Sequence, residues 1–146
     1  MAAWYTIINA LRTYLRAQTA FQTVIVEAGA MDPDAYDLAT AYAGGAVFLI
    51  RDREGQDNPL ALSGPNGQID FFVECWIRDD GTDPLDGYGD LATLEDNLTD
   101  ALTAFVRAGV SGLTITDMQI DETIGDADAR RPMVGSRKTI SITWGQ

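Results

Sequence analysis

The segment DFFVECWIR, residues 70–78, decides the fold because its side chains alternate in the way that predicts a β-strand. Successive side chains of a strand point to opposite faces of a sheet. One row is apolar throughout and comprises Ile69, Phe71, Val73, Cys75 and Ile77. The other row should face water, yet it holds two large aromatic rings among charges. It comprises Asp70, Phe72, Glu74, Trp76 and Arg78.

Two other segments have the periodicity of amphipathic helices. Apolar residues recur at spacings of three and four in residues 3–21 and again in residues 88–107, which is the pattern of a helix with one buried face. The second helix should end at Gly109, because glycine often follows the last helical turn. Residues 27–45 are less regular, and only a short helix after Pro33 is expected there.

Further segments are expected to form strands. Residues 46–51, 113–120 and 137–144 are β-prone or alternating, and residues 24–26 could add a short strand. The elements do not follow the regular βαβ order of a parallel sheet. We therefore expect an α+β fold in a single domain, residues 1–146, in which two helices pack on one face of a mostly antiparallel sheet of about four strands.

The second face of this sheet lacks a cover in that arrangement, and it would carry Phe72 and Trp76. Clustered aromatic residues on an exposed face are typical of protein interfaces, so we expect both side chains to contact a neighbouring subunit. The alternative is that residues 27–45 or 52–68 of the same chain fold over them. The sequence leaves both interpretations open.

Acidic residues outnumber basic ones by 22 to 10, which gives a formal net charge of −12. A molecule of this sign is not expected to bind nucleic acid tightly, since phosphate contacts require Lys and Arg. The charge is expected to keep the protein soluble, or else to form a surface that repels phosphate.

The residue types that catalysis requires are sparse. The chain has no histidine, which removes the commonest general base and transition-metal ligand. Its single cysteine, Cys75, belongs to the apolar row, where burial would leave the thiol inert. No phosphate-binding glycine motif is present. We therefore expect neither enzymatic activity nor a cofactor.

The acidic segment DDGTDPLDGYGD, residues 79–90, is the strongest metal candidate. Its spacing departs from a calcium-binding EF-hand loop, because the sixth position is Pro84 instead of glycine and the last position is an aspartate. We expect no bound metal, and a solvated turn in which Asp86 or a neighbour caps the following helix. No apolar run reaches the roughly 18 residues of a membrane span, so no membrane association is expected.

Four of the ten basic residues lie close together in the segment ARRPMVGSRK, residues 129–138. They are Arg130, Arg131, Arg137 and Lys138. The segment is expected to be an exposed hairpin with charged flanks, or else a docking arm for an acidic partner or a neighbouring copy of the same acidic subunit.

Six segments together carry a resemblance to a known family. They are WYTIINALRTYL, AVFLIR, IDFFVECWIR, YGDLATLEDNLTDALTAF, LTITDMQIDETIG and SRKTISITW. Their order resembles that of the tail terminator, or tail completion, proteins of long-tailed bacteriophages, which include the minor tail protein U-like family. The resemblance covers most of the chain. It fails in residues 27–45, which are longer and less strand-like than the family pattern.

This resemblance implies a structural virion subunit that forms a ring, typically a hexamer, at the head-proximal end of the tail. Such a ring stops polymerisation of the tail tube and offers a surface to the neck. The implied partners are further copies of the chain, the tail tube protein and a neck or head-completion protein, assembled in the host cytoplasm. DNA passes through the ring without specific binding, and a channel lined by carboxylates would repel its phosphates.

Two alternatives remain open. The chain could form a different ring of the same particle, such as a neck or head-closure ring. It could also be an acidic decoy that imitates DNA and inhibits a nucleic-acid-binding protein. A decoy should bind a basic partner in a salt-dependent way.

Overall fold

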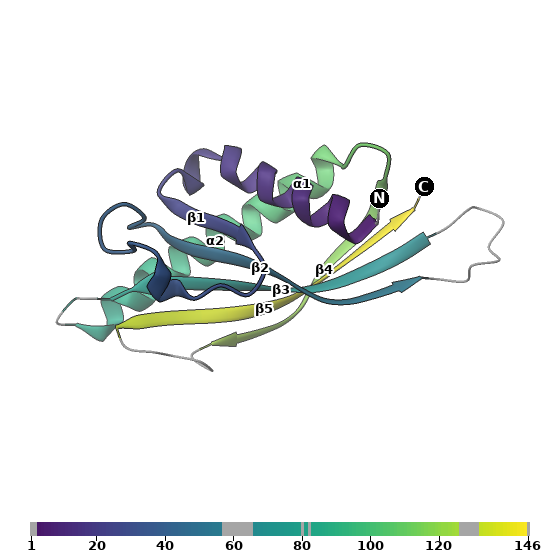
Figure 1. Cartoon of the computed structure of the whole chain (residues 1–146). Coiled ribbons are helices and arrows are strands. Elements are labelled where there is room, and N and C mark those ends of the chain that lie inside the picture. Colours follow the sequence, from purple (N-terminus) through teal and green to yellow (C-terminus); the bar gives the residue numbers. More distant parts are fainter. Residues whose placement is uncertain (1–2, 57–65, 80, 82, 126–131, 146) are drawn as a thin grey trace.

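The computed structural model of the chain describes residues 3–56, 66–79, 81, 83–125 and 132–145. Within these residues, two helices lie on one face of a five-stranded sheet (Figure 1). The helices are α1 (Ala3–Ala17) and α2 (Pro84–Ala108), and two short 3-10 turns are η1 (Thr19–Phe21) and η2 (Pro33–Ala35). The strands are β1 (Val24–Ala28), β2 (Gly45–Gln56), β3 (Asn66–Arg78), β4 (Thr114–Gly125) and β5 (Met133–Gly145).

The strand order across the sheet is β1-β2-β3-β5-β4. β1 runs parallel to β2, and every other neighbouring pair is antiparallel. The predicted α+β fold with helices on one face is therefore confirmed, with five strands instead of about four. The additional strand is the short segment around residues 24–26, which pairs in parallel because residues 29–44 supply the crossover that parallel neighbours require.

The hairpin of β2 and β3 extends further than the sequence pattern indicates. β2 continues beyond residue 51 through an irregularity between Arg51 and Arg53, and its pairing with β3 reaches Gln56 and Gly67. A bulge absorbs one extra residue while the ladder resumes, so the charged run does not end the strand. The paired strands extend past the helical layer (Figure 1).

Both helices have boundaries that local chemistry explains. α1 ends at Ala17, earlier than the predicted residue 21, and η1 follows it. α2 begins earlier than predicted, at Pro84, because the Asp83 carboxylate accepts a hydrogen bond of 3.0 Å from the Leu85 N–H and caps the first turn. Gly109 ends the helix as predicted, with φ 74°, a conformation that favours glycine.

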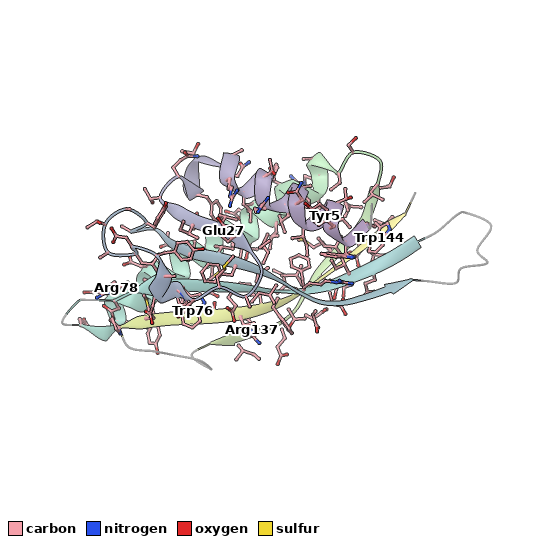
Figure 2. All side chains as sticks on the ribbon, viewed as in Figure 1. Tyr5, Glu27, Trp76, Arg78, Arg137 and Trp144 are labelled. Atoms are coloured by element: carbon pink, nitrogen blue, oxygen red, sulfur yellow. The ribbon has the colours of Figure 1, made fainter. Side chains whose placement is uncertain are left out.

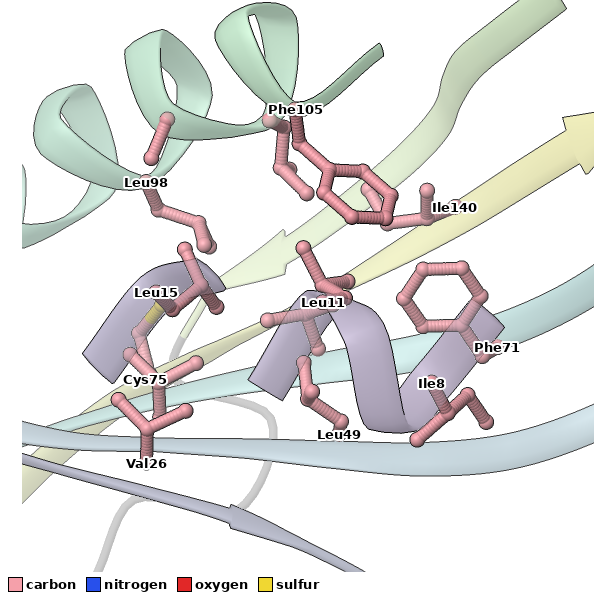
Figure 3. Packing of buried hydrophobic residues seen from close by; sticks show 14 of the residues in the cluster. Ile8, Leu11, Leu15, Val26, Leu49, Phe71, Cys75, Leu98, Phe105 and Ile140 are labelled. Atoms are coloured by element: carbon pink, nitrogen blue, oxygen red, sulfur yellow. The ribbon is translucent and has the colours of Figure 1, made fainter. Parts of the chain in front are cut away.

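The main hydrophobic core lies between the helices and the sheet (Figure 3). Leu11 and Leu15 of α1 and Leu98 of α2 are fully buried. They pack with the apolar row of β3, including Phe71 and Cys75. Burial of each such side chain contributes about 1.5 to 3 kcal/mol, so these side chains form the stable interior of the domain.

Candidate interaction surfaces

Trp76 of β3 lies on the sheet face that the helices leave free, here called the outer face (Figure 2). Only 5% of its surface is exposed. It belongs to a small second core with Leu38, Ala46, Phe48 and Met133, against which Tyr36, Tyr42, Ile25 and Ile50 pack. Part of this cover comes from residues 29–44, the connection between β1 and β2. The expected exposure of Trp76 is therefore wrong, and the alternative, cover by residues 27–45 of its own chain, is correct for this side chain.

Asp37 holds that connection in place. Its carboxylate accepts hydrogen bonds from the Thr40 hydroxyl and from the backbone N–H groups of Ala39, Thr40 and Ala41. These donors, the Thr40 hydroxyl first, lower the pKa of Asp37 from its usual 3.8 because they stabilise the charged form. The ionised carboxylate thus supports the turn that begins with Leu38, a neighbour of Trp76 in the second core.

Phe72, Glu74 and Arg137 form one stack further along the outer face. Glu74 is 8% exposed, and its Oε2 accepts hydrogen bonds from Arg137 Nη2 at 2.6 Å and Nε at 3.2 Å. Its Oε1 lies 3.4 Å from the donor Nε1 of Trp76. The Arg137 guanidinium carbon lies 4.8 Å from the centre of the Phe72 ring. Phe72 itself is half-buried, so its contact with a neighbouring subunit stays a prediction.

A polar row crosses the outer face beside this stack. Ser141 of β5 lies between two carboxylates, with its hydroxyl oxygen 2.7 Å from Asp70 Oδ1 and 2.6 Å from Asp121 Oδ2. One hydroxyl proton can serve only one of these acceptors at a time. The row therefore presents concentrated negative charge to the solvent side of β3, β5 and β4.

Lys138 lies on the helix-covered face of β5, opposite to Arg137, because consecutive strand residues alternate. Its side chain is 9% exposed, and Nζ lies 3.2 Å from Glu95 Oε2 of α2 and 3.3 Å from Thr123 Oγ1 of β4. The prediction that Lys138 joins Arg137 in a docking arm is wrong, since an internal ion pair engages its charge. Arg130 and Arg131 lie outside the described residues.

Cys75 is fully buried in the main core. Burial, with a smaller contribution from the Glu95 carboxylate, raises the pKa of its thiol to about 12. The predicted burial of this thiol on the apolar row is confirmed. A thiol that stays protonated at neutral pH is a poor nucleophile.

The acidic segment before α2 contains the helix cap that the sequence suggests, and the capping residue is Asp83 instead of Asp86. Asp79 Oδ1 accepts a hydrogen bond of 3.0 Å from the Gly81 N–H, which folds the preceding turn. Among the residues that the structure describes, no three acidic, histidine or cysteine side chains are grouped to hold a metal ion. Neither described helix is long and apolar enough to cross a membrane.

A groove of about 310 Å³ lies beneath α1, at the end of β1. Its lining includes Trp4, Ile8, Arg12, Gly29, Leu49 and Arg51. The Arg51 guanidinium carbon lies 3.9 Å from the centre of the Trp4 ring, which is a cation–π contact. β1 ends at Ala28 while β2 continues to Gln56. The groove therefore adjoins a stretch of β2 that, in the described structure, has no strand on that side.

β4 forms the opposite edge of the sheet, and within the part of the chain that the structure describes it pairs with β5 alone. Most of its residues are exposed, including the large apolar Ile120 and Ile124 at 37% and 39%. The acidic side chains Asp117, Asp121 and Glu122 are exposed beside them. Sequence analysis did not identify either this edge or the groove as a surface for partners. Isoleucines interspersed with acidic residues in TITDMQIDETIG are the signal that could have indicated the edge.

Comparison with known proteins gives a fold and no family. No protein-family model matches the chain, and no curated protein is similar to it in sequence. Among solved structures, a chain of the "Virion of native gene transfer agent (GTA) particle" has the same fold with a TM-score of 0.60. The likeness covers 99% of this chain and 98% of that chain, at 15% sequence identity.

Proposed function

We propose that the chain is a structural subunit of a phage-like virion that acts as a tail terminator. The observation that carries this proposal is the end-to-end match in fold to a chain of a gene transfer agent virion. The match extends over 99% of this chain and 98% of that chain, so it concerns the whole fold and not one motif of it. The order of elements that resembles tail terminators supports the finer assignment to the head-proximal end of the tail.

The surface of the described residues supports the proposal that the protein acts by assembling with other subunits. Helices cover one sheet face, whereas the outer face is covered over Trp76 and leaves Phe72 half-buried. The β4 edge exposes Ile120 and Ile124, and exposed edges with apolar side chains tend to be covered by other chains. These features suit a ring subunit with neighbours on its sides.

In the proposed mechanism, copies of the chain close into a ring, which we expect to be a hexamer. One ring face matches the last ring of the tail tube, and the other lacks the surface that adds another tube ring and instead receives a neck or head-completion protein. The net charge of −12 would give a channel that repels DNA phosphates, so that DNA passes without binding. The mechanism is geometric and we propose no catalytic step.

The test is a capping assay in which tail tube protein of the same particle polymerises with and without this chain. Tubes that stop at a defined length, with a ring at one end in electron micrographs, would support the proposal. Tubes of unchanged length with no ring attached would contradict it. A ring that binds the neck protein but leaves tubes uncapped would instead favour a head-closure role, and salt-sensitive binding of basic protein by a monomer would favour a DNA-mimic inhibitor.

A further inference from the structure

We propose that the groove beneath α1 receives the acidic β4 edge of a second copy of this chain, with Glu122 of that copy placed between Arg51 and Arg12. This inference rests on the proposed function, because it identifies the contact between neighbouring subunits that closes the ring. It draws on four observations among the described residues: a guanidinium in the groove without a carboxylate partner, a carboxylate on β4 without a cationic partner, exposed isoleucines on the same strand, and the position of both surfaces at opposite sheet edges.

The groove has positive charge that the described residues of its own chain do not fully neutralise. Arg51 rests on Trp4 and has no carboxylate partner within the described residues. Arg12 donates from Nη2 to Asn9 Oδ1 at 3.1 Å, and its Nη1 lies 4.0 Å from Glu27 Oε2. Its Nε is buried without a hydrogen-bond partner. The Arg12 side chain is 34% exposed as a whole, so the accessible part of its guanidinium, together with Arg51, favours an added carboxylate oxygen at this end of the groove.

The floor of the same groove is apolar. Ile8 of α1 and Leu49 of β2 lie among its lining residues, and both are buried in the main core. The Tyr5 ring at its rim is 47% exposed. A fitting occupant therefore combines one carboxylate with a neighbouring apolar side chain, which an inorganic anion does not offer.

β4 presents that combination. Glu122 and Ile124 point to the same face of the strand, because they lie opposite Thr139 and Arg137 of β5 in the antiparallel register. Glu122 is exposed and has no hydrogen-bond or ion-pair partner among the residues that the structure describes. The 12-residue strand carries no Lys, Arg or Pro, so all of its charged side chains are acidic and suit a basic surface on the partner copy.

The two surfaces differ from each other and lie at opposite ends of the strand order, near β1 and at β4. A contact that joins two different surfaces of identical subunits is heterologous, so each copy contacts one neighbour at each edge. Such contacts form a closed ring when the rotation between neighbouring subunits brings the last copy back to the first. A net charge of −12 makes copies repel one another at long range. The arginines of the groove supply local attraction that directs the acidic edge to one place.

The test uses reversal of the two charges. Arg51→Glu places acid against acid at every contact, and Glu122→Arg places base against base. Each single variant should raise the protein concentration at which half of the chain is assembled by at least about tenfold, measured as native mass by light scattering. An equimolar mixture of the two variants should recover assembly, because every contact then pairs opposite charges in an alternating ring.

Matched controls carry the same charge changes away from both surfaces. Arg107→Glu and Asp96→Arg alter exposed positions of α2, and both should assemble as the unaltered chain does. Far-UV circular dichroism of each variant establishes that it is folded. The Arg51→Glu and Glu122→Arg double variant, in which the pair is exchanged within one chain, should also recover assembly.

Three results would overturn this contact. They are single variants that assemble like the unaltered chain, single variants that fail to assemble and are not rescued by mixing, and an unaltered chain that stays monomeric at all concentrations. The proposed function is decided separately by the capping assay. Capped tubes together with any of these results would retain the terminator role and move the subunit contact to another surface.

Discussion

Trp76 of β3 and Gly135 of β5 are cross-strand partners, and a Cβ atom at position 135 would lie 2.6 Å from Cε3 of the indole. The helix-covered face holds the reciprocal arrangement, in which Gly67 of β3 lies opposite Trp144 of β5. In both pairs the glycine leaves room for the indole to lie against the neighbouring backbone, and large aromatic side chains are known to shield glycines in this way.

Replacing Gly135 by alanine should therefore destabilise the fold by about 1 to 3 kcal/mol, because the added methyl group would overpack the Trp76 site. Gly89→Ala in α2 is the control, since nothing lies within 4 Å of a Cβ atom there, and alanine in a helix gains about 0.5 to 1 kcal/mol over glycine. Urea unfolding of both variants measures the difference. Equal stability of the two would mean that the indole does not depend on Gly135.

The Glu74–Arg137 pair should contribute to stability, because Glu74 is buried and each of its oxygens has a donor. Glu74→Gln and Arg137→Met should each cost about 1 to 3 kcal/mol. Combining them should cost less than the sum of the two single losses, as a double-mutant cycle by urea unfolding would measure. Strict additivity would show that the two side chains act independently.

Phe72 and Trp76 should respond differently to replacement by serine. Trp76→Ser removes a buried indole and should cost about 3 to 5 kcal/mol in unfolding free energy. Phe72→Ser, at a half-buried position, should leave a folded chain and reduce assembly if Phe72 contacts a neighbouring subunit. Thermal unfolding and light scattering on the same samples separate the two effects, and unchanged assembly of Phe72→Ser would remove this residue from the interface.

The turn beginning at Asp37 should loosen in acid. Its pKa is lowered in the folded chain, so the stability that the charged form provides is present above the unfolded value near 3.8 and is lost as the pH falls through the lower folded pKa. The Trp76 indole N–H resonance in a proton–nitrogen NMR titration should shift in this range. In Asp37→Asn that shift should be absent, and an identical titration curve would assign the transition to another carboxyl group.

The Cys75 thiol should be inert in the folded protein, because burial and a pKa of about 12 keep it protonated. At about pH 8, Ellman's reagent should react slowly with the folded chain and rapidly in urea. The raised pKa stabilises the fold below the unfolded thiol value of about 9.0, and this contribution is lost progressively as the pH rises towards 12. Cys75→Ala should lose less stability than the unaltered chain over that interval.

The periodic parts of the chain could be predicted because each buries one face. The alternation of residues 137–144 and the helical spacing of residues 88–107 correspond to β5 and α2. The apolar row of β3, with Cys75 in it, is the floor of the main core. These patterns report burial against a neighbouring layer, which is a property that sequence spacing records directly.

The cover of the outer face could not be predicted from the spacing of apolar residues. Trp76 is covered by an irregular connection whose path depends on Asp37 hydrogen bonds and on the parallel pairing of β1, and neither has a periodic signal. The docking role predicted for Lys138 rests on its place in the basic segment, residues 129–138. Its burial depends on Glu95, more than forty positions away in the sequence, meeting it across the helix–sheet interface at 3.2 Å. The groove beneath α1 likewise joins residues from three separate elements.

The strand order also has a consequence for synthesis of the chain. β4 leaves the ribosome before β5, yet among the described strands its pairing partner is β5, which lies between it and β3. β4 must therefore wait without a partner strand until the chain beyond it has been translated. An unpaired strand is prone to aggregate, and the acidic side chains Asp117, Asp121 and Glu122 keep this one hydrated during the interval.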